Sequence, residues 1–347
     1  MARLLLRHLG QTLLATWLLA SAVFLLSRAG GDQAVQLALA PSVDLTAPAV
    51  SQAEMLASST AVRLRLGLDR PLFYIGRSAA GTWQWRGWHN QYHQWLRGLL
   101  HGNLGNSFRS GEPVSQRLAG ALALTLPLTG TAAALAALAA LALATSLAAA
   151  PRWQQPVRTV LVGLHSIPLF VIALGLLLLL ANPELLNWFP AYGFAPGSSA
   201  TTPERLLDAL PRLVLPVTAL VLSALPELTL QLDTALAHEL RQPYVLTARA
   251  KGLRASAVVR RHALRNALLP TLAQLAELLP AMVAGAVVVE VIFALPGMGR
   301  LLAEAAATRD YPLLVGGVLV VGTARLLSLL LADLSYSWAD PRIRWNP

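Results

Sequence analysis

The segment 244–270 holds the residues by which this chain could most plainly engage another molecule. It carries Arg249, Lys251, Arg254, Arg260 and Arg261, and it lies between two long apolar segments. The pattern predicts two short helices, 244–251 and 255–268, separated by a glycine at 252. A proline at 270 is expected to end the exposed part and to begin the next apolar segment. We call this predicted helix–glycine–helix segment, residues 244–270, the elbow. An exposed segment of this form gives another protein a surface that it can bind and displace.

Other chemistry is poorly supported by the residues present. The chain has no cysteine, which excludes disulfides, thiolate catalysis and cysteine-bound metal centres. Its only lysine, Lys251, stands between alanine and glycine, so the phosphate-binding sequence Gly-x-x-x-x-Gly-Lys-Ser/Thr is absent. His238-Glu239 begins like a zinc-protease motif, but residue 242 is glutamine instead of the second histidine. We therefore predict no catalytic residue, no cofactor and no metal site.

Composition places the chain in a membrane. Of its 347 residues 55% are hydrophobic and only 13% are charged, whereas soluble domains carry about 25% charged residues. The net charge of +10 could suggest a nucleic-acid partner. Much of it lies in short loops and near the chain ends, so the positive-inside bias of membrane proteins explains it better. We therefore expect a lipid bilayer as partner and no nucleic acid.

Six uncharged or nearly uncharged segments are long enough to span a bilayer. They are 8–27, a span within 118–151, 159–183, about 211–232, about 271–294 and about 312–334. The expected fold is an all-α membrane protein of six transmembrane helices, with an external domain between the first two. Its parts are the N-terminus and first helix (1–27), the external domain (28–117) and a five-helix core (118–347) that contains the elbow region 233–270. The short basic segments place the elbow and both termini in the cytoplasm.

The external segment contains a cluster of aromatic side chains. Trp83, Trp85 and Trp88 are followed by apolar positions at helical spacing over 91–100, which predicts a helix lying on the membrane surface. His89 and His93, with His101 nearby, are four apart and could face one ligand on a helix. A metal contact is one interpretation, and a solvated or interfacial pair is the favoured one.

Four ionisable residues interrupt the apolar segments: Glu227, Glu277, Glu290 and Arg325. Charges at membrane depth are costly and face a cavity or a partner. A proton relay in an ion-coupled secondary transporter is one interpretation. Pairing within the helix bundle, or the lining of a polar pathway, is the favoured one, and Glu290 is expected to be structural.

Several motifs together resemble the permease subunits of bacterial binding-protein-dependent ABC importers, in particular the B-type subunit of the dipeptide/oligopeptide/nickel group. They are LGLDRPL (66–72), GNLGNSF (102–108), SIP (166–168), TARAKG (247–252), HALRNALLP (262–270), EVIFALPGMGRLL (290–302), RDYP (309–312) and DPRI (340–343). Where the broad superfamily has Glu-Ala-Ala, this chain has Leu-Thr-Ala at 246–248; Thr-Ala is usual for the peptide group, whereas Leu246 replaces a polar or charged residue. The chain also departs at Gln231, Asp233 and Thr234, where basic residues are usual, and by an apparent insertion around the three tryptophans.

The resemblance implies a bacterial inner-membrane permease that forms a translocation path for di- or oligopeptides or a similar small solute. It also implies four partners: a second homologous permease subunit, two ATP-binding subunits and an external solute-binding protein. The elbow would dock on an ATP-binding subunit. The residues expected in that contact are Tyr244, Thr247, Ala248, Arg249, Ala250, Lys251, Gly252, Arg254, Arg260 and Arg261. An ion-coupled secondary transporter stays the alternative, although no inverted repeat is visible in the sequence.

Overall fold

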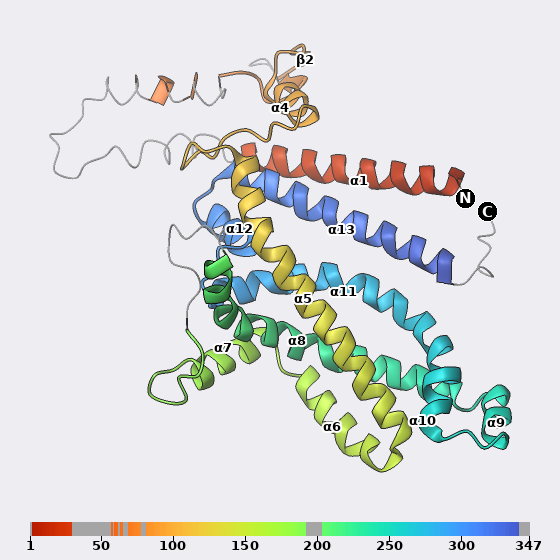
Figure 1. Cartoon of the computed structure of the whole chain (residues 1–347). Coiled ribbons are helices and arrows are strands. Elements are labelled where there is room, and N and C mark those ends of the chain that lie inside the picture. Colours follow the sequence, from red (N-terminus) through yellow and green to blue (C-terminus); the bar gives the residue numbers. More distant parts are fainter. Residues whose placement is uncertain are drawn as a thin grey trace. The chain divides into compact units, whose positions relative to one another are not determined.

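The computed structural model describes residues 2–29, 57, 59–61, 63–64, 69–77, 81–191 and 203–339, and this part of the chain is predominantly helical (Figure 1). The long helices are α1 (Ala2–Ala29), α5 (Val114–Ala149), α8 (Pro203–Glu239), α11 (Leu264–Ile292) and α13 (Tyr311–Ala339). The shorter helices are α4 (Gln91–Leu100), α6 (Gln154–His165), α7 (Leu169–Leu180), α9 (Pro243–Ala250), α10 (Ala255–Val258) and α12 (Met298–Ala307). A 3₁₀ turn, η2 (Pro151–Trp153), precedes α6, and a π-helical turn, η3 (Val259–Ala263), precedes α11. The motif at 340–343 and part of the one at 66–72 lie outside the described residues.

Helices of membrane-spanning length and apolarity are present. α5 and the Leu210–Glu239 part of α8 both qualify, and α6 with α7 adds a third if this bent pair is one span. Shorter apolar stretches occur at Leu13–Leu25, Ala281–Ile292 and Tyr311–Leu327. The predicted third span is thus not one straight helix, because the chain turns by 96° between α6 and α7. Pro168, at the start of α7, explains the break, since proline disfavours helical geometry in the residue before it.

The chain divides into two compact units, of which the first comprises residues 1–121 and 301–323. In it, β1 (Ile75–Arg77) pairs antiparallel with β2 (Trp83–Trp85), and Asn90 caps α4 by accepting a hydrogen bond from the His93 N–H. The ring of Phe24 in α1 stacks on Trp95 of α4 with centroids 4.7 Å apart. The predicted helix at 91–100 is therefore confirmed. The hairpin was not predicted, and it places Trp83 and Trp85 on β2.

The second unit comprises residues 122–300 and 324–347 and contains the larger apolar core. Here α8 packs on α6, α7 and α11, and α11 also packs on α7. α5 contributes Ala132, Ala136 and Ala140, which recur every four residues and are buried. Small side chains at this spacing let helix backbones approach closely, which is how helices associate in a membrane.

A buried carboxylate fixes the turn between α11 and α12. Thr125 Oγ1 donates to Glu290 Oε1 (2.6 Å), while the N–H groups of Gly299 (2.7 Å) and Arg300 (3.1 Å) donate to Oε2. A Cβ at Gly297 would lie 2.2 Å from the carboxyl carbon, so no side chain fits there. Glu290 is fully buried, and both its oxygens are engaged. This geometry agrees with the structural role expected for it.

The other ionisable residues that interrupt the apolar segments lie in different settings. Glu227 is exposed and accepts a hydrogen bond from Gln274 (2.5 Å). Arg325 in α13 is exposed as well. The side chain of Glu277 lies outside the described part of the chain. Glu227 in α8 therefore has a polar partner on the neighbouring helix α11, as pairing within the helix bundle requires.

Candidate functional site: the elbow between α8 and α11

The elbow has the helix–glycine–helix form that the sequence predicts. α9 begins with Pro243 at its first turn and ends at Ala250, with Lys251 as its C-cap. Gly252 has a φ of +77°, a left-handed conformation that glycine adopts without the cost of a Cβ. Its N–H donates to the carbonyl of Arg249 (2.9 Å) and closes the turn. Arg254 then precedes α10.

The second arm of the elbow differs from the prediction. Instead of a separate helix ending before Pro270, α10 runs through the π-helical turn into α11, and Pro270 lies inside α11. The prediction that Pro270 starts a new segment is therefore wrong. Ala267 and Thr271 on either side of the proline are buried, and such packing sustains a helix across a proline in a membrane protein. The exposed elbow and the following apolar helix are thus one continuous helical element.

An apolar interior holds the two arms together. Val245 and Ala248 of α9 pack with Val258 of α10, and Leu240 covers them from the end of α8. A second cluster joins the π-helical turn to the ends of α8 and α5, through Val259, Ala263, Ala267, Leu232, Leu236 and Ala144. The burial of Ala248 means that it serves this interior packing, although the sequence included it among the contact residues.

Two hydrogen bonds, here called the polar tie, join the end of α8, the start of α9 and the start of α11. Tyr244 Oη donates to Glu239 Oε2 (2.5 Å), and Asn266 Nδ2 donates to Tyr244 Oη (3.2 Å). Partial desolvation, and then the hydrogen bond to Glu239, raise the pKa of Tyr244 above its usual 10. The phenol therefore stays protonated and keeps donating. Sequence reasoning missed Glu239 and Asn266, although Asn266 lies within the motif at 262–270.

The cations of the elbow are available to a partner. The five that the sequence places in the contact are exposed, and none of them forms a salt bridge to another described residue; they are Arg249, Lys251, Arg254, Arg260 and Arg261. Thr247 and Ala250 are also exposed. In Figure 1, α9 and α10 lie at the ends of α8 and α11 that are remote from α7. A rigid elbow with a cationic surface suits the cleft of an acidic partner protein.

A buried ion pair supports the same end of α8. Arg158 Nε lies 2.5 Å from Asp233 Oδ2, and Asp233 is 2% exposed. This pair joins α6 to α8. Next to it, a cavity of about 620 Å³ is lined by α8 and the start of α11, including His238, Glu239 and Asn266.

The histidine pair of the external segment does not form the arrangement considered for a metal. His89 precedes the N-cap of α4, so it does not share a helix face with His93. His93 Nδ1 instead lies 3.0 Å from the hydroxyl of Tyr74. Within the described ranges, no three His, Asp or Glu side chains gather closely enough to hold a metal ion. The interpretation of one shared metal contact on a helix is therefore wrong.

The tryptophans of the hairpin form an exposed aromatic surface. Trp83, Trp85 and Trp88 are 74%, 63% and 62% exposed. Tyr74 stacks on Trp85 with ring centroids 5.8 Å apart and meets Trp88 edge-on. Amphipathic rings presented in this way suit an interface between water and an apolar surface.

Comparison with known proteins agrees with this geometry. A sequence family described as binding-protein-dependent transport system inner membrane component matches residues 132–345, which include the whole elbow. The chain is 35% identical over 300 residues to the di/tripeptide transport system permease protein DppB of Pseudomonas aeruginosa, covering 81% of this chain and 83% of that protein. It is 33% identical over 259 residues to the oligopeptide transport system permease protein AppB of Bacillus subtilis, covering 74% of this chain and 80% of that protein.

Proposed function

Because the chain belongs to the binding-protein-dependent transport system inner membrane component family, we propose that it forms the translocation path of an ATP-driven importer of di- or oligopeptides. Relatives that are named as peptide permeases match it along most of its length. The family consists of membrane transport components that work with other subunits. The alternative of an ion-coupled secondary transporter gains no support from these comparisons.

The proposed assembly contains a second homologous permease subunit, two ATP-binding subunits and an external solute-binding protein. The chain crosses the bacterial inner membrane six times, by α1, α5, the α6–α7 pair, α8, α11 and α13. Residues 28–117 lie outside, and both termini and the elbow lie in the cytoplasm. The basic segments between apolar helices support this orientation through the positive-inside bias.

The elbow is the proposed contact with an ATP-binding subunit. The observation that carries this proposal is a cationic surface on a rigid interior: Arg249, Lys251 and Arg254 are exposed, while Val245 and Val258 are buried between the arms. Since α10 continues into α11, a displacement of the elbow is passed directly to a membrane helix. Binding and hydrolysis of ATP on the partner can thereby open the path to one side of the membrane and then to the other.

The test compares charge changes on and off the elbow in the purified importer. Replacing Arg249, Lys251 and Arg254 together by Gln is expected to weaken the hold on the ATP-binding subunits by about tenfold or more, since several ion pairs are lost. The matched control replaces three exposed cations outside the elbow by Gln, namely Arg70, Arg97 and Arg152. Co-purification and peptide-stimulated ATPase activity are measured. Equal assembly and activity in both sets of variants would contradict the docking role.

A further inference from the structure

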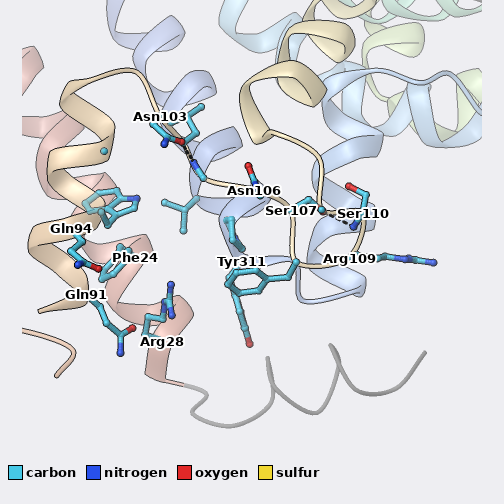
Figure 2. Close-up of a pocket in the computed structure, with 18 residues that line it drawn as sticks. Phe24, Arg28, Gln91, Gln94, Asn103, Asn106, Ser107, Arg109, Ser110 and Tyr311 are labelled. Atoms are coloured by element: carbon cyan, nitrogen blue, oxygen red, sulfur yellow. Dashed lines mark hydrogen bonds between the residues drawn. The ribbon is translucent and has the colours of Figure 1, made fainter. Parts of the chain in front are cut away.

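The first unit contains a cavity of about 800 Å³. It is enclosed by the end of α1, by α4, by the 103–111 loop and by the start of α13. Figure 2 shows Arg28 and Phe24 on one side and Tyr311 on the other, while Arg109 points away. The cavity is large enough for a polar headgroup.

Arg28 is a charged group of this cavity that forms no ion pair with another residue in the described part of the chain. Its guanidinium lies over the ring of Phe24 (5.5 Å) and near the ring of Phe108 (5.9 Å). Its Nη1 is buried and has no hydrogen-bond partner among the described residues. Contact with aromatic rings compensates a buried cation only in part, and a buried donor without an acceptor is costly. An anion with at least one acceptor oxygen would satisfy both this donor and the positive charge.

The surroundings of Arg28 also favour an anion. No Asp or Glu occurs among the described residues that line the cavity, whereas neutral polar groups such as Gln94, Asn106 and Tyr311 do. The nearby carboxylate of Asp310 is already engaged by Ser107 Oγ and by the Phe108 N–H (3.1 Å). A guanidinium with neutral donors around it is the arrangement that recognises a phosphate or a carboxylate.

The position of Arg28 on α1 favours a lipid headgroup as the anion. The apolar stretch of α1 ends at Leu25, and three further residues of helix rise by about 4.5 Å. That distance is comparable to the depth of the headgroup layer outside the hydrocarbon core, which is about 5–7 Å. Trp17 and Leu14 lie on the same side of the helix as Arg28, three and four turns earlier, and are 44% and 55% exposed. They form an apolar track along which acyl chains can lie.

We propose that this cavity binds the phosphate group of a membrane phospholipid, with Arg28 as its principal ligand. The proposal rests on the proposed membrane span of α1. A bound lipid would hold the end of α1 against α4 and the start of α13, and would thereby attach this part of the first unit to the membrane. The same phosphate chemistry is available from free phosphate in solution, and the test separates the two sources.

The experiment uses the full chain assembled with its partners and purified in mild detergent. Native mass spectrometry counts the phospholipids retained by the wild-type protein, by Arg28→Gln and by Arg28→Lys. Arg97→Gln is the matched control, because Arg97 is exposed in α4 and lies outside the cavity. Arg28→Gln is expected to retain about tenfold less of one lipid, as for the loss of a charge-assisted hydrogen bond. Arg28→Lys should be intermediate, and the control should match the wild type.

Added inorganic phosphate should leave the lipid in place, because the acyl chains contribute to its binding. Displacement of the lipid by inorganic phosphate, equal retention in Arg28→Gln, or a retained peptide in place of a lipid would each overturn the proposal. A photoreactive phospholipid tests the wild-type chain without any substitution, and its crosslinks should fall in 24–28 and 103–111. Crosslinks confined to other segments would also refute it. Neither readout depends on ATP hydrolysis or peptide uptake, so a failure of the proposed transport function remains distinguishable.

Discussion

Gly252 allows a quantitative test of the elbow. Its φ of +77° costs a residue with a Cβ about 1 kcal/mol, and a β-branched residue more. A Cβ at this position meets no atom within 4 Å, so the whole cost arises in the backbone. Asparagine enters this left-handed region more readily than alanine does. We therefore expect the destabilisation of the elbow to increase from Asn to Ala to Val.

The effect is measurable as an affinity. A cost of about 1 kcal/mol changes an equilibrium by about fivefold, so Gly252→Ala should raise the concentration of ATP-binding subunit needed for half-maximal ATPase stimulation by about that factor. Gly252→Asn should raise it less, and Gly252→Val should raise it more. The control is Gly102→Ala, because Gly102 also has a positive φ (+73°) and open space around its Cα but lies in the first unit.

The order of the variants separates two explanations. If backbone strain decides, asparagine is milder than alanine despite its greater volume. If the glycine instead leaves room for the partner, the larger asparagine is the more harmful of the two. An ATPase stimulation that falls in the order Gly, Ala, Asn would refute the strain argument, and wild-type behaviour of Gly252→Val would refute both.

Three further predictions concern other contacts. Glu290→Gln should lower the free energy of unfolding by about 1–3 kcal/mol, because an amide whose oxygen accepts the two N–H groups turns its NH2 group toward Thr125 Oγ1 and cannot accept the hydrogen bond from that hydroxyl. Glu290→Ala should lower it more, and thermal unfolding in detergent measures both. Tyr244→Phe should lower the free energy of unfolding by about 1 kcal/mol. Because the pKa of Tyr244 is raised, the hydroxyl's contribution to stability is complete below pH 10 and is lost as the pH rises through the raised pKa. Unfolding measured as a function of pH checks this. Replacing Trp83, Trp85 and Trp88 by Ala should loosen the solute-binding protein or the membrane contact of the hairpin while the ATP-binding subunits stay bound. Co-purification measures this last effect, and loss of the ATP-binding subunits alone would reverse the assignment.

Local sequence signals predicted those features that depend on local geometry. Helix α4 follows from apolar spacing over 91–100, and its bounds match the expectation. The break at Gly252 was predictable because few residues other than glycine adopt a positive φ at low cost. The first arm of the elbow was predictable to within one residue at each end, and so was the start of the second arm at Ala255. The end of the second arm was not predictable in this way.

Features that depend on distant residues were not predictable in this way. The hairpin was missed because three-residue strands carry almost no periodicity, and its tryptophans lie beside a helical pattern. The continuity of α10 with α11 was missed because proline suggests a boundary, whereas packing around Ala267 and Thr271 overrides that preference. The tie between Glu239, Tyr244 and Asn266 joins residues up to 27 positions apart, and no local pattern indicates such pairs.

The continuity of α11 gives the elbow a direct mechanical connection to the interior of the second unit. At one end of α11, Asn266 is tied to Tyr244 of the elbow. At the other end, Glu290 holds Thr125 of α5 and the first N–H groups of α12. The 24 residues between Asn266 and Glu290 correspond to about 36 Å of helix. Because polar contacts bind both ends, a rotation of the elbow must either carry the α12 turn with it or break the Glu290 contacts. Since those contacts are buried and each broken one leaves an unpaired donor, we expect the first outcome to cost less, so that the end of α11 at Glu290 follows the elbow.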